Sequence, residues 1–167
     1  KGEALVIPHG IEQGFFLYPR PQLKINEFSS ERPFKLLYVS SIEPYKHHFQ
    51  VIDAVSKVRA EGFPVVLKLI GGAKPADANR LKKKIQNIDP LGHFVKYLGF
   101  NTHEELLLEY CKADVFIFAS SCETFGQILL EGMASGLPIV CSNHRPMPDI
   151  LGDAGVYFDP ENADSIE

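Results

Sequence analysis

The sequence predicts a doubly wound α/β domain, with a Rossmann-like parallel sheet and helices on both faces. Short apolar runs alternate along the chain with segments of helical periodicity, which is typical of this class. The runs are almost continuously apolar, as expected for strands that are covered on both faces. Because crossovers between parallel strands are right-handed, the helices should divide between the two faces.

Strands are expected where a short apolar run ends in turn residues. The run 34–40 continues into a Ser-Ser-Ile-Glu-Pro loop, and the run 64–70 ends at Gly71 and Gly72. By the same criterion we expect further strands at residues 4–8, 93–98, 113–119, 137–141 and 155–158.

Helices are expected between these strands. Segment 47–61 carries one apolar stripe and stops at Gly62, as helices often do. Thr102 and Glu105 have the spacing of a capping box, which should begin a helix over 102–111. Other helices are expected at 77–87, from near Gly126, and from 162, with a short turn at 149–151 and a loop over 10–33 that Phe15 and Phe16 anchor.

Composition indicates one globular domain without a nucleic-acid partner. The chain has 167 residues and a net charge of −4, whereas a nucleic-acid footprint needs clustered basic residues. The one lysine triplet, 82–84, is expected to be a solvated helix face. No apolar run is long enough for a membrane helix. The start at Lys1 without Met predicts a fragment of a longer protein.

The cysteines favour a reducing compartment. The three cysteines follow no metal-ligand spacing, and Cys111 and Cys141 lie in apolar surroundings. We therefore expect these two to be core thiols, no bound metal and a cytoplasmic protein. Separately, we expect the full-length protein to make a peripheral contact with the inner face of a membrane.

The stretch 120–138 holds the strongest chemical pattern. Glu123 and Glu131 have seven residues between them, on either side of Phe125 and Gly126. A helix that begins near Gly126 directs its free N–H groups toward the preceding turn, where an anion can bind. Gln127 shares a helix face with Glu131. The pattern predicts an anion site flanked by two carboxylates.

The other polar loops should meet this stretch at one edge of the sheet. Ligands of doubly wound sheets bind beyond the carboxyl ends of the strands. The loops expected there are 8–10, 40–46, 71–74, 99–101, 119–127 and 142–148.

These residues resemble a known family. The segments Glu-Thr-Phe-Gly at 123–126 and Leu-Glu-Gly-Met-Ala-Ser-Gly-Leu-Pro-Ile-Val at 130–140 are similar to the motif of the retaining, group 1 nucleotide-sugar glycosyltransferases of two-domain GT-B architecture. Segments 7–11, 37–39, 69–72, 98–100 and 154–160 follow in the family's order. The resemblance implies that residues 1–167 are one half of a GT-B fold, the C-terminal donor-binding domain, without the N-terminal acceptor domain and the end of the C-terminal helix.

The resemblance also implies roles for matching residues. Glu131 should accept hydrogen bonds from the ribose hydroxyls, and Glu123 should hold hydroxyls of the transferred sugar. Lys46 should neutralise the diphosphate, so that Glu123 and Lys46 are the catalytic candidates. Backbone N–H groups around Phe125, Gly126 and Gln127 should lie near the sugar and the diphosphate.

Further donor-binding candidates have structural alternatives. Ser41 stands five residues before Lys46, where the family usually has Arg, which weakens the expected cationic clamp. Gly71 is a candidate whose alternative is a strand-exit turn, and Phe100 is a base-pocket candidate whose alternative is loop packing. His47 and His48 are expected to be exposed helix residues rather than an acid or a base.

The sequence therefore predicts a glycosyltransferase of glycan biosynthesis that transfers a sugar, with retention, from a UDP- or GDP-sugar to a glycan or lipid-linked acceptor. The nucleotide sugar is the expected partner of this fragment, which should bind donor without transferring it, and no cofactor is expected. An NAD-dependent dehydrogenase is disfavoured because Gly-x-Gly-x-x-Gly is absent after the first strand. The remaining alternative is a catalytically inactive binding or regulatory module of the same fold.

Overall fold

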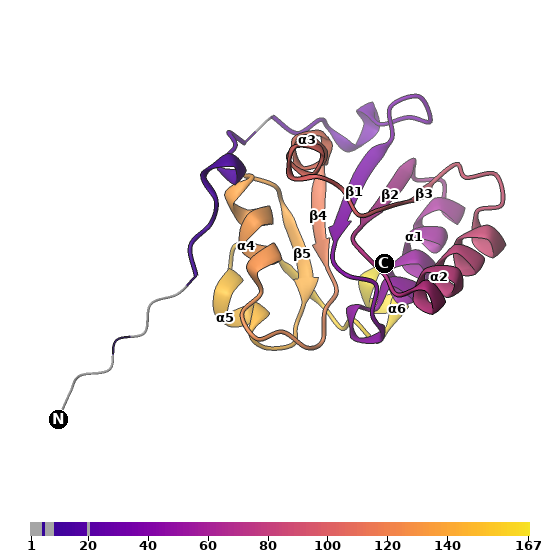
Figure 1. The fold of residues 1–167 in the computed structure, drawn as a ribbon. Helices are drawn as coiled ribbons and strands as arrows, with labels where there is room; N and C mark the ends of the chain where they lie inside the picture. The colour runs from indigo at the N-terminus through magenta and orange to yellow at the C-terminus, as the bar shows by residue number, and fades with distance from the viewer. Residues whose placement is uncertain (1–4, 6–8, 20) are drawn as a thin grey trace.

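A parallel six-stranded sheet organises the chain, whose computed structural model describes residues 5, 9–19 and 21–167. The strand order is β3-β2-β1-β4-β5-β6 and every pairing is parallel. This is the order of a Rossmann-like doubly wound sheet, so the predicted fold class is confirmed (Figure 1). The strands are β1 (Phe34–Val39), β2 (Val65–Ile70), β3 (Val95–Gly99), β4 (Val115–Phe118), β5 (Ile139–Ser142) and β6 (Val156–Phe158).

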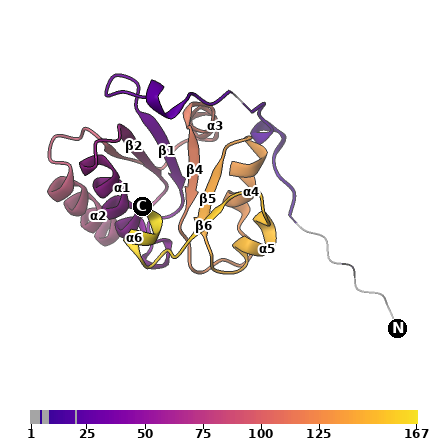
Figure 2. The same ribbon diagram turned by 180° about the vertical axis from the view of Figure 1, so that it is seen from behind.

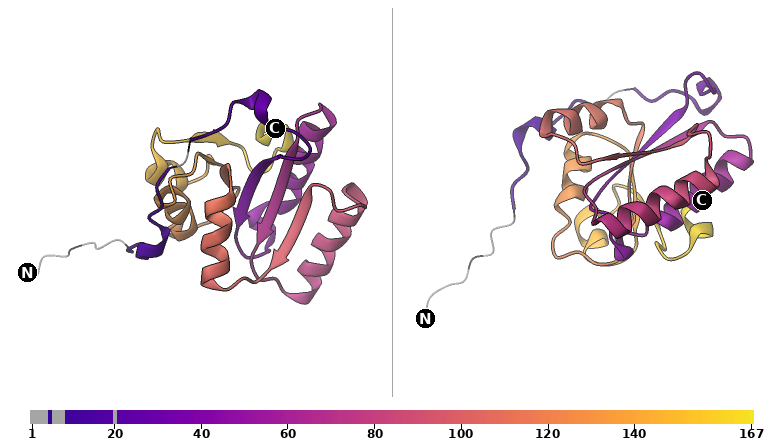
Figure 3. Two further views of the ribbon diagram at one scale, coloured as in Figure 1. Left: turned by 90° about the horizontal axis from the view of Figure 1, so that it is seen from above. Right: turned by 45° about the vertical axis from the view of Figure 1, so that its right-hand side comes forward.

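Helices cover both faces of the sheet (Figures 1 and 2). On one face α1 (His48–Ala60) packs against α2 (Pro75–Ile88) and α6 (Ala163–Ile166). The other face carries α3 (His103–Lys112), α4 (Gln127–Ala134) and α5 (Met147–Leu151). The chain changes face after β3, because the return to β4 runs in the opposite direction across the sheet. Figure 3 shows the sheet between these two layers.

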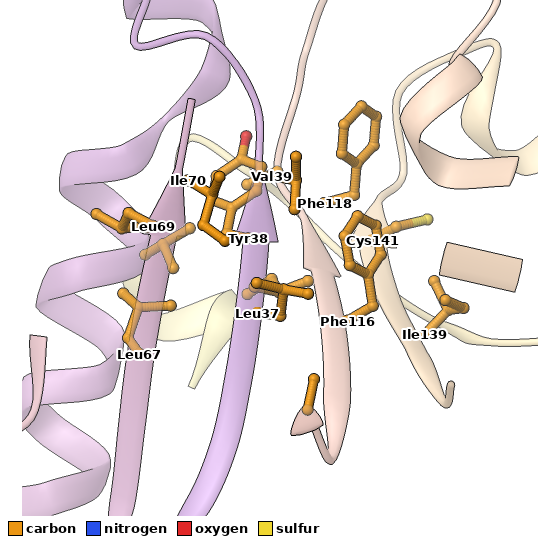
Figure 4. Packing of buried hydrophobic residues seen from close by; sticks show 14 of the residues in the cluster. Leu37, Tyr38, Val39, Leu67, Leu69, Ile70, Phe116, Phe118, Ile139 and Cys141 are labelled. Carbon is orange, nitrogen blue, oxygen red and sulfur yellow. The ribbon is translucent and has the colours of Figure 1, made fainter. Parts of the chain in front are cut away.

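The core lies along the four inner strands, β2, β1, β4 and β5 (Figure 4). Leu37 and Tyr38 are neighbours on β1 and point to opposite faces, yet both are fully buried. Leu67 and Leu69 of β2 and Phe116 and Phe118 of β4 are fully buried as well. The continuous apolar runs of the sequence thus reflect a sheet covered on both faces.

The helix ends follow the local signals of the sequence. The amide of Glu105 donates to Thr102 Oγ1 (3.3 Å) and the amide of Thr102 donates to Glu105 Oε2 (2.8 Å), which is the predicted capping box at α3. After α1, Gly62 has a φ of +98°, a conformation that favours glycine.

Five expectations need comment. The segment 149–151 belongs to the helix α5 rather than a turn, and Cys111 is exposed on α3 rather than buried, because it lies on the solvent side of that helix. Cys141 is buried, as expected. The loop 10–33 includes the short 3₁₀ helices η1 (Gln13–Phe15) and η2 (Ile25–Glu27); there Phe15 is buried, but Phe16 is 64% exposed. The expected strand 4–8 lies outside the described residues, apart from Leu5.

No helix within the described part of the chain has the length and the apolar composition needed to cross a membrane.

Replacement of Gly132 in α4 should test the packing of this helix on β4. A methyl group at Gly132 would lie 2.6 Å from Cδ1 of Phe116, which is fully buried and stacked between Tyr110 and Phe118. We expect Gly132→Ala to lower the free energy of unfolding in urea by about 1–3 kcal/mol, although alanine favours the helix by about 1 kcal/mol. The control is Asn79→Ala at an exposed position of α2. Gly132→Ala unfolding at or above the wild-type urea midpoint would contradict this packing.

Candidate functional site

The first part of the site is the turn between β4 and α4. Gly126 precedes the first residue of α4 with a φ of +78°, and its carbonyl accepts from the amide of Leu129 at 3.0 Å. An added Cβ at Gly126 would lie 3.2 Å from Cδ1 of Ile150. Glycine therefore lets the chain turn into the helix, whose first N–H groups face the carboxyl edge of the sheet.

A buried ion pair joins this turn to the loop after β1. Lys46 belongs to the 3₁₀ helix η3 (Pro44–Lys46), and its Nζ donates to Glu123 Oε1. The Lys46 side chain is 7% exposed and that of Glu123 is 16% exposed. The structure thus brings together the two residues that the sequence proposed as catalytic, although 77 positions separate them in the chain.

Further hydrogen bonds hold the same two loops together. The Tyr38 hydroxyl donates to the carbonyl of Lys46 at 2.5 Å, which fixes η3 over the end of β1. The amide of Ser121 donates to the carbonyl of Tyr45 at 2.9 Å. His47 Nε2 and Ser121 Oγ are 2.7 Å apart. Except for the buried Tyr38, every residue in these contacts lies within two sequence positions of Lys46 or Glu123.

A cavity of about 490 Å³ opens beside the ion pair. The ring of His9 meets the ring of Phe125 edge-on, with 5.0 Å between centroids. Gln127 Nε2 donates to the carbonyl of Gly10 at 3.0 Å, so the N-terminal segment forms one wall. The lining residues are His9, Gly10, Phe118, Glu123, Thr124, Phe125, Gly126, Gln127 and Ile128.

Glu131 lies on the second turn of α4, outside the residues that line this cavity. It is partly buried, and its Oε2 accepts a hydrogen bond of 3.3 Å from the Tyr110 hydroxyl. Burial raises the pKa of the Glu131 carboxyl, and the nearby Glu12 adds to this, whereas the Tyr110 hydroxyl and His103 act to lower the pKa. The two glutamates of the motif therefore have different partners, a cation for Glu123 and a phenol for Glu131.

Three other donor-binding candidates lie at the same edge of the sheet, and none of them lines the cavity formed by the described residues. Ser41 is exposed in the loop after β1. Phe100 follows β3, and its side chain is 85% exposed. Gly71 has a φ of +147°, and an added Cβ would lie 1.9 Å from the Ser40 carbonyl oxygen, so close backbone approach alone explains a glycine there.

The expectation that His47 and His48 are exposed is wrong. The His47 side chain bonds to Ser121, and this residue has a φ of +49° at the start of α1. The His48 ring is stacked on Tyr38, with 4.7 Å between centroids, and its Nε2 is 3.0 Å from Ser40 Oγ. Burial lowers the pKa of both histidines, that of His48 to about 3. A position at the start of a helix does not by itself predict burial, and here the first turn of α1 packs against the loops at the sheet edge.

Sequence reasoning missed Tyr110 and Ser121. Tyr110 occupies an apolar position of α3, where nothing distinguishes a core aromatic from one with a hydrogen-bond partner. Ser121 lies within the stretch 120–138, but its sequence position alone did not indicate that it contacts His47. Among the described residues, no group of three or more His, Cys, Asp or Glu side chains could hold a metal ion.

Residues 20–167 match the protein family described as Glycosyl transferases group 1. The chain therefore belongs to this family. It is 31% identical over 136 residues to the O-antigen chain mannosyltransferase B of Escherichia coli, covering 78% of this chain and 34% of that protein. It is 33% identical over 161 residues to the alpha-monoglucosyldiacylglycerol synthase of Streptococcus pneumoniae, covering 92% of this chain and 35% of that one. The chain thus spans about a third of these relatives.

Solved structures share the fold. The C-terminal domain of LpcC, a group 1 glycosyl transferase of Francisella tularensis, superposes with a TM-score of 0.73 at 21% identity, over 94% of this chain and 84% of that one. Anabaena HepE, crystallised in complex with UDP and glucose, has a TM-score of 0.71 at 21% identity, over 84% of this chain and 38% of that one.

Titration of His48 should make stability depend on pH. Its folded pKa of about 3 lies below the ordinary value of 6.5, so below pH 6.5 the unfolded chain binds more protons. The stability that neutral His48 contributes is complete above pH 6.5 and is lost as the pH falls toward 3. Between pH 7 and pH 5 this loss should be about 2 kcal/mol.

The measurement is urea unfolding at pH 7 and pH 5. We expect His48→Gln to show a smaller decrease in stability between these pH values than the wild type. His93→Gln, at an exposed position before β3, should retain the wild-type decrease. The same decrease in all three proteins would show that His48 is not the titrating group.

Proposed function

We propose that this chain is the donor-binding domain of a retaining glycosyltransferase that uses a nucleoside-diphosphate sugar. The observation that carries the proposal is the buried Lys46–Glu123 pair, which lies next to the start of α4 and beside a cavity of about 490 Å³. A cation and a helix N-terminus together favour a diphosphate, and a carboxylate in the cavity wall can accept from sugar hydroxyls. Membership of the group 1 family supports the same assignment.

Transfer of the sugar leaves a nucleoside diphosphate, so the central catalytic requirement is stabilisation of the negative charge that develops on it. In the proposed complex Lys46 and the backbone N–H groups at the start of α4 supply this stabilisation, with no metal ion. A bound diphosphate would draw Lys46 partly away from Glu123 and leave that carboxylate free to hold the sugar. The exchange is feasible because the backbone of Lys46 is held by Tyr38 and the loop that carries Glu123 is held through Ser121.

The proposed role of Glu131 is to bind the ribose. One of its oxygens already accepts from Tyr110, and a carboxylate has further acceptor sites for a ribose hydroxyl. Phe100 and Ser41, at the ends of the neighbouring strands, are proposed to lie along the nucleotide.

We propose that the acceptor binds to a part of the full-length protein outside this chain, which spans about a third of its relatives. Relatives named as a mannosyltransferase and a glucosyldiacylglycerol synthase support a hexose donor and a glycan or lipid-linked acceptor. We propose that the isolated chain binds donor without transferring sugar.

A nucleotide-binding module without transfer is the second candidate. The observation that favours it is the exposed Ser41, which supplies no second cation to the diphosphate. Transfer assays on the full-length protein separate the two candidates.

The proposal is tested by calorimetry of this chain with UDP, GDP and NAD. Binding of UDP or GDP without binding of NAD supports a donor domain, and failure of both diphosphates to bind contradicts it. A thermal-shift series with UDP- and GDP-sugars then identifies the donor, since a ligand at 100 times its dissociation constant stabilises the fold by about 2.7 kcal/mol.

Removing the charge of Glu131 should weaken nucleotide binding. We expect Glu131→Gln to raise the dissociation constant of the preferred diphosphate at least tenfold, because hydrogen bonds to charged groups contribute about 1.5–3 kcal/mol. Calorimetry measures the change. Glu61→Gln, at an exposed position after α1, removes the same charge at the opposite edge of the sheet and should bind like the wild type. Unchanged affinity in Glu131→Gln would rule out the ribose role.

Removing the charge of Lys46 should weaken the binding of the nucleoside diphosphate and leave the binding of the nucleoside almost unchanged. We expect Lys46→Met to raise the dissociation constant of UDP or GDP at least tenfold, because a buried cation no longer faces the phosphates. The weak affinity for uridine or guanosine should change less than twofold, as measured by ligand-observed NMR. Lys82→Met, on the exposed face of α2, is the control. Equal losses for nucleoside and diphosphate would indicate general damage to the site.

A further inference from the structure

Among the described residues, Tyr110 is the one that donates a hydrogen bond to the carboxylate of Glu131, and the ring of Tyr110 is held rigidly. The residue lies near the end of α3 and is 1% exposed. The ring of Phe116 on β4 stacks on it, with 5.5 Å between centroids and 25° between planes. Phe15 of η1 meets it edge-on at 5.4 Å and 86°. Three elements therefore fix the position of the phenol.

The hydroxyl of Tyr110 acts as a donor. It lies 3.3 Å from Glu131 Oε2, and a buried phenol needs a partner for its O–H group. Burial raises the pKa of Tyr110 well above its ordinary value, and the Glu131 charge adds to this effect. The phenol therefore keeps its proton over the whole range in which the carboxylate titrates, so it donates to Glu131 in the ionised state.

We propose that Tyr110 is a positioning residue for nucleotide binding: its hydroxyl holds Oε2 of Glu131, so that Oε1 faces the ligand, and it keeps the carboxylate ionised. This inference rests on the proposed function, because it assigns Tyr110 to the ribose end of that same site. Tyr110 itself is buried and is not proposed to touch the ligand.

The surroundings of Glu131 make such a donor necessary. The carboxylate is partly buried, and desolvation favours its neutral form. Glu12, from the segment before η1, acts to raise the pKa of Glu131. His103, from the first turn of α3, acts to lower the pKa of Glu131. His103 Nε2 lies 3.0 Å from Glu12 Oε1, so the two groups with opposite effects on Glu131 are next to each other. The Tyr110 hydroxyl remains as the neutral donor that supports the ionised form at every pH.

The test is Tyr110→Phe, which keeps the ring packing and removes the hydroxyl. Calorimetry with UDP, and with GDP in parallel, is performed at pH 7.5 and pH 5.5, and is repeated with the 2′-deoxynucleotides. The matched control is Tyr157→Phe, because the Tyr157 hydroxyl also donates to one acceptor, the carbonyl of Gly152 at 2.6 Å, but belongs to β6.

We expect Tyr110→Phe to bind the ribonucleotide about tenfold more weakly at pH 7.5 and to lose further affinity at pH 5.5 more steeply than the wild type. The penalty for removing the 2′-hydroxyl should be smaller in the variant, because Glu131 no longer holds the ribose firmly. Tyr157→Phe should bind within twofold of the wild type. Tyr110→Phe binding within twofold of the wild type, or weaker binding with an unchanged 2′-deoxy penalty, would overturn the inference.

A ligand-free measurement separates this inference from the proposed function. Carbon-13 NMR of the Glu131 carboxyl should show a higher pKa in Tyr110→Phe than in the wild type, whether or not UDP or GDP binds. If the variant does not fold, the Cζ resonance of Tyr110 in the wild type should report the titration of Glu131, and this step should vanish in Glu131→Gln. A persisting step, or an equal carboxyl pKa in both proteins, would overturn the role of Tyr110 and leave the proposed function intact.

Discussion

The ion pair between Lys46 and Glu123 is the interaction on which the site depends. Removing two charges from water carries a desolvation penalty of several kcal/mol per ion, which is offset only when each ion has a well-placed partner. Here the pair is supported by the bond from Tyr38 to the Lys46 carbonyl and by the contacts of Ser121 with Tyr45 and His47. These contacts tie the loop of Lys46 to the loop of Glu123, so the two side chains can change partners while the loops stay together.

The location of this pair follows from the topology of the sheet. β1 and β4 are neighbours, but the chain leaves β1 toward β2 and leaves β4 toward β5, in opposite directions. Their following helices, α1 and α4, therefore lie on opposite faces of the sheet, while the two loops meet through the Lys46–Glu123 pair at the strand ends. Such a switch point leaves a crevice beyond the strand ends. The cavity beside Phe125 and the start of α4 lies at this edge of the sheet, where it is lined by the turn after β4 and by His9 and Gly10.

The sequence predicted an element correctly where a residue type has a single common structural role. Continuous apolar runs identified the strands because a sheet covered on both faces excludes polar side chains, and Gly126 indicated the start of α4. The sequence did not predict the surroundings of a side chain whose contact partner belongs to another helix or strand. The burial of His48 depends on Tyr38, and the bond of Tyr110 depends on Glu131. Periodicity describes one face of one helix, and it contains nothing about the side chains that pack opposite.

The two glutamates of the motif are suited to different ligand groups because of their partners. Glu123 is balanced by a cation, so in the proposed complex an incoming diphosphate would compete with it for Lys46 and release its oxygens. Glu131 is partnered by a neutral phenol, and no anion can compete for that bond on charge grounds. Its ionised state depends on fixed neighbours rather than on the ligand. Charge neutralisation at one end and a preformed acceptor at the other together favour a ligand with a diphosphate between two polyhydroxylated groups.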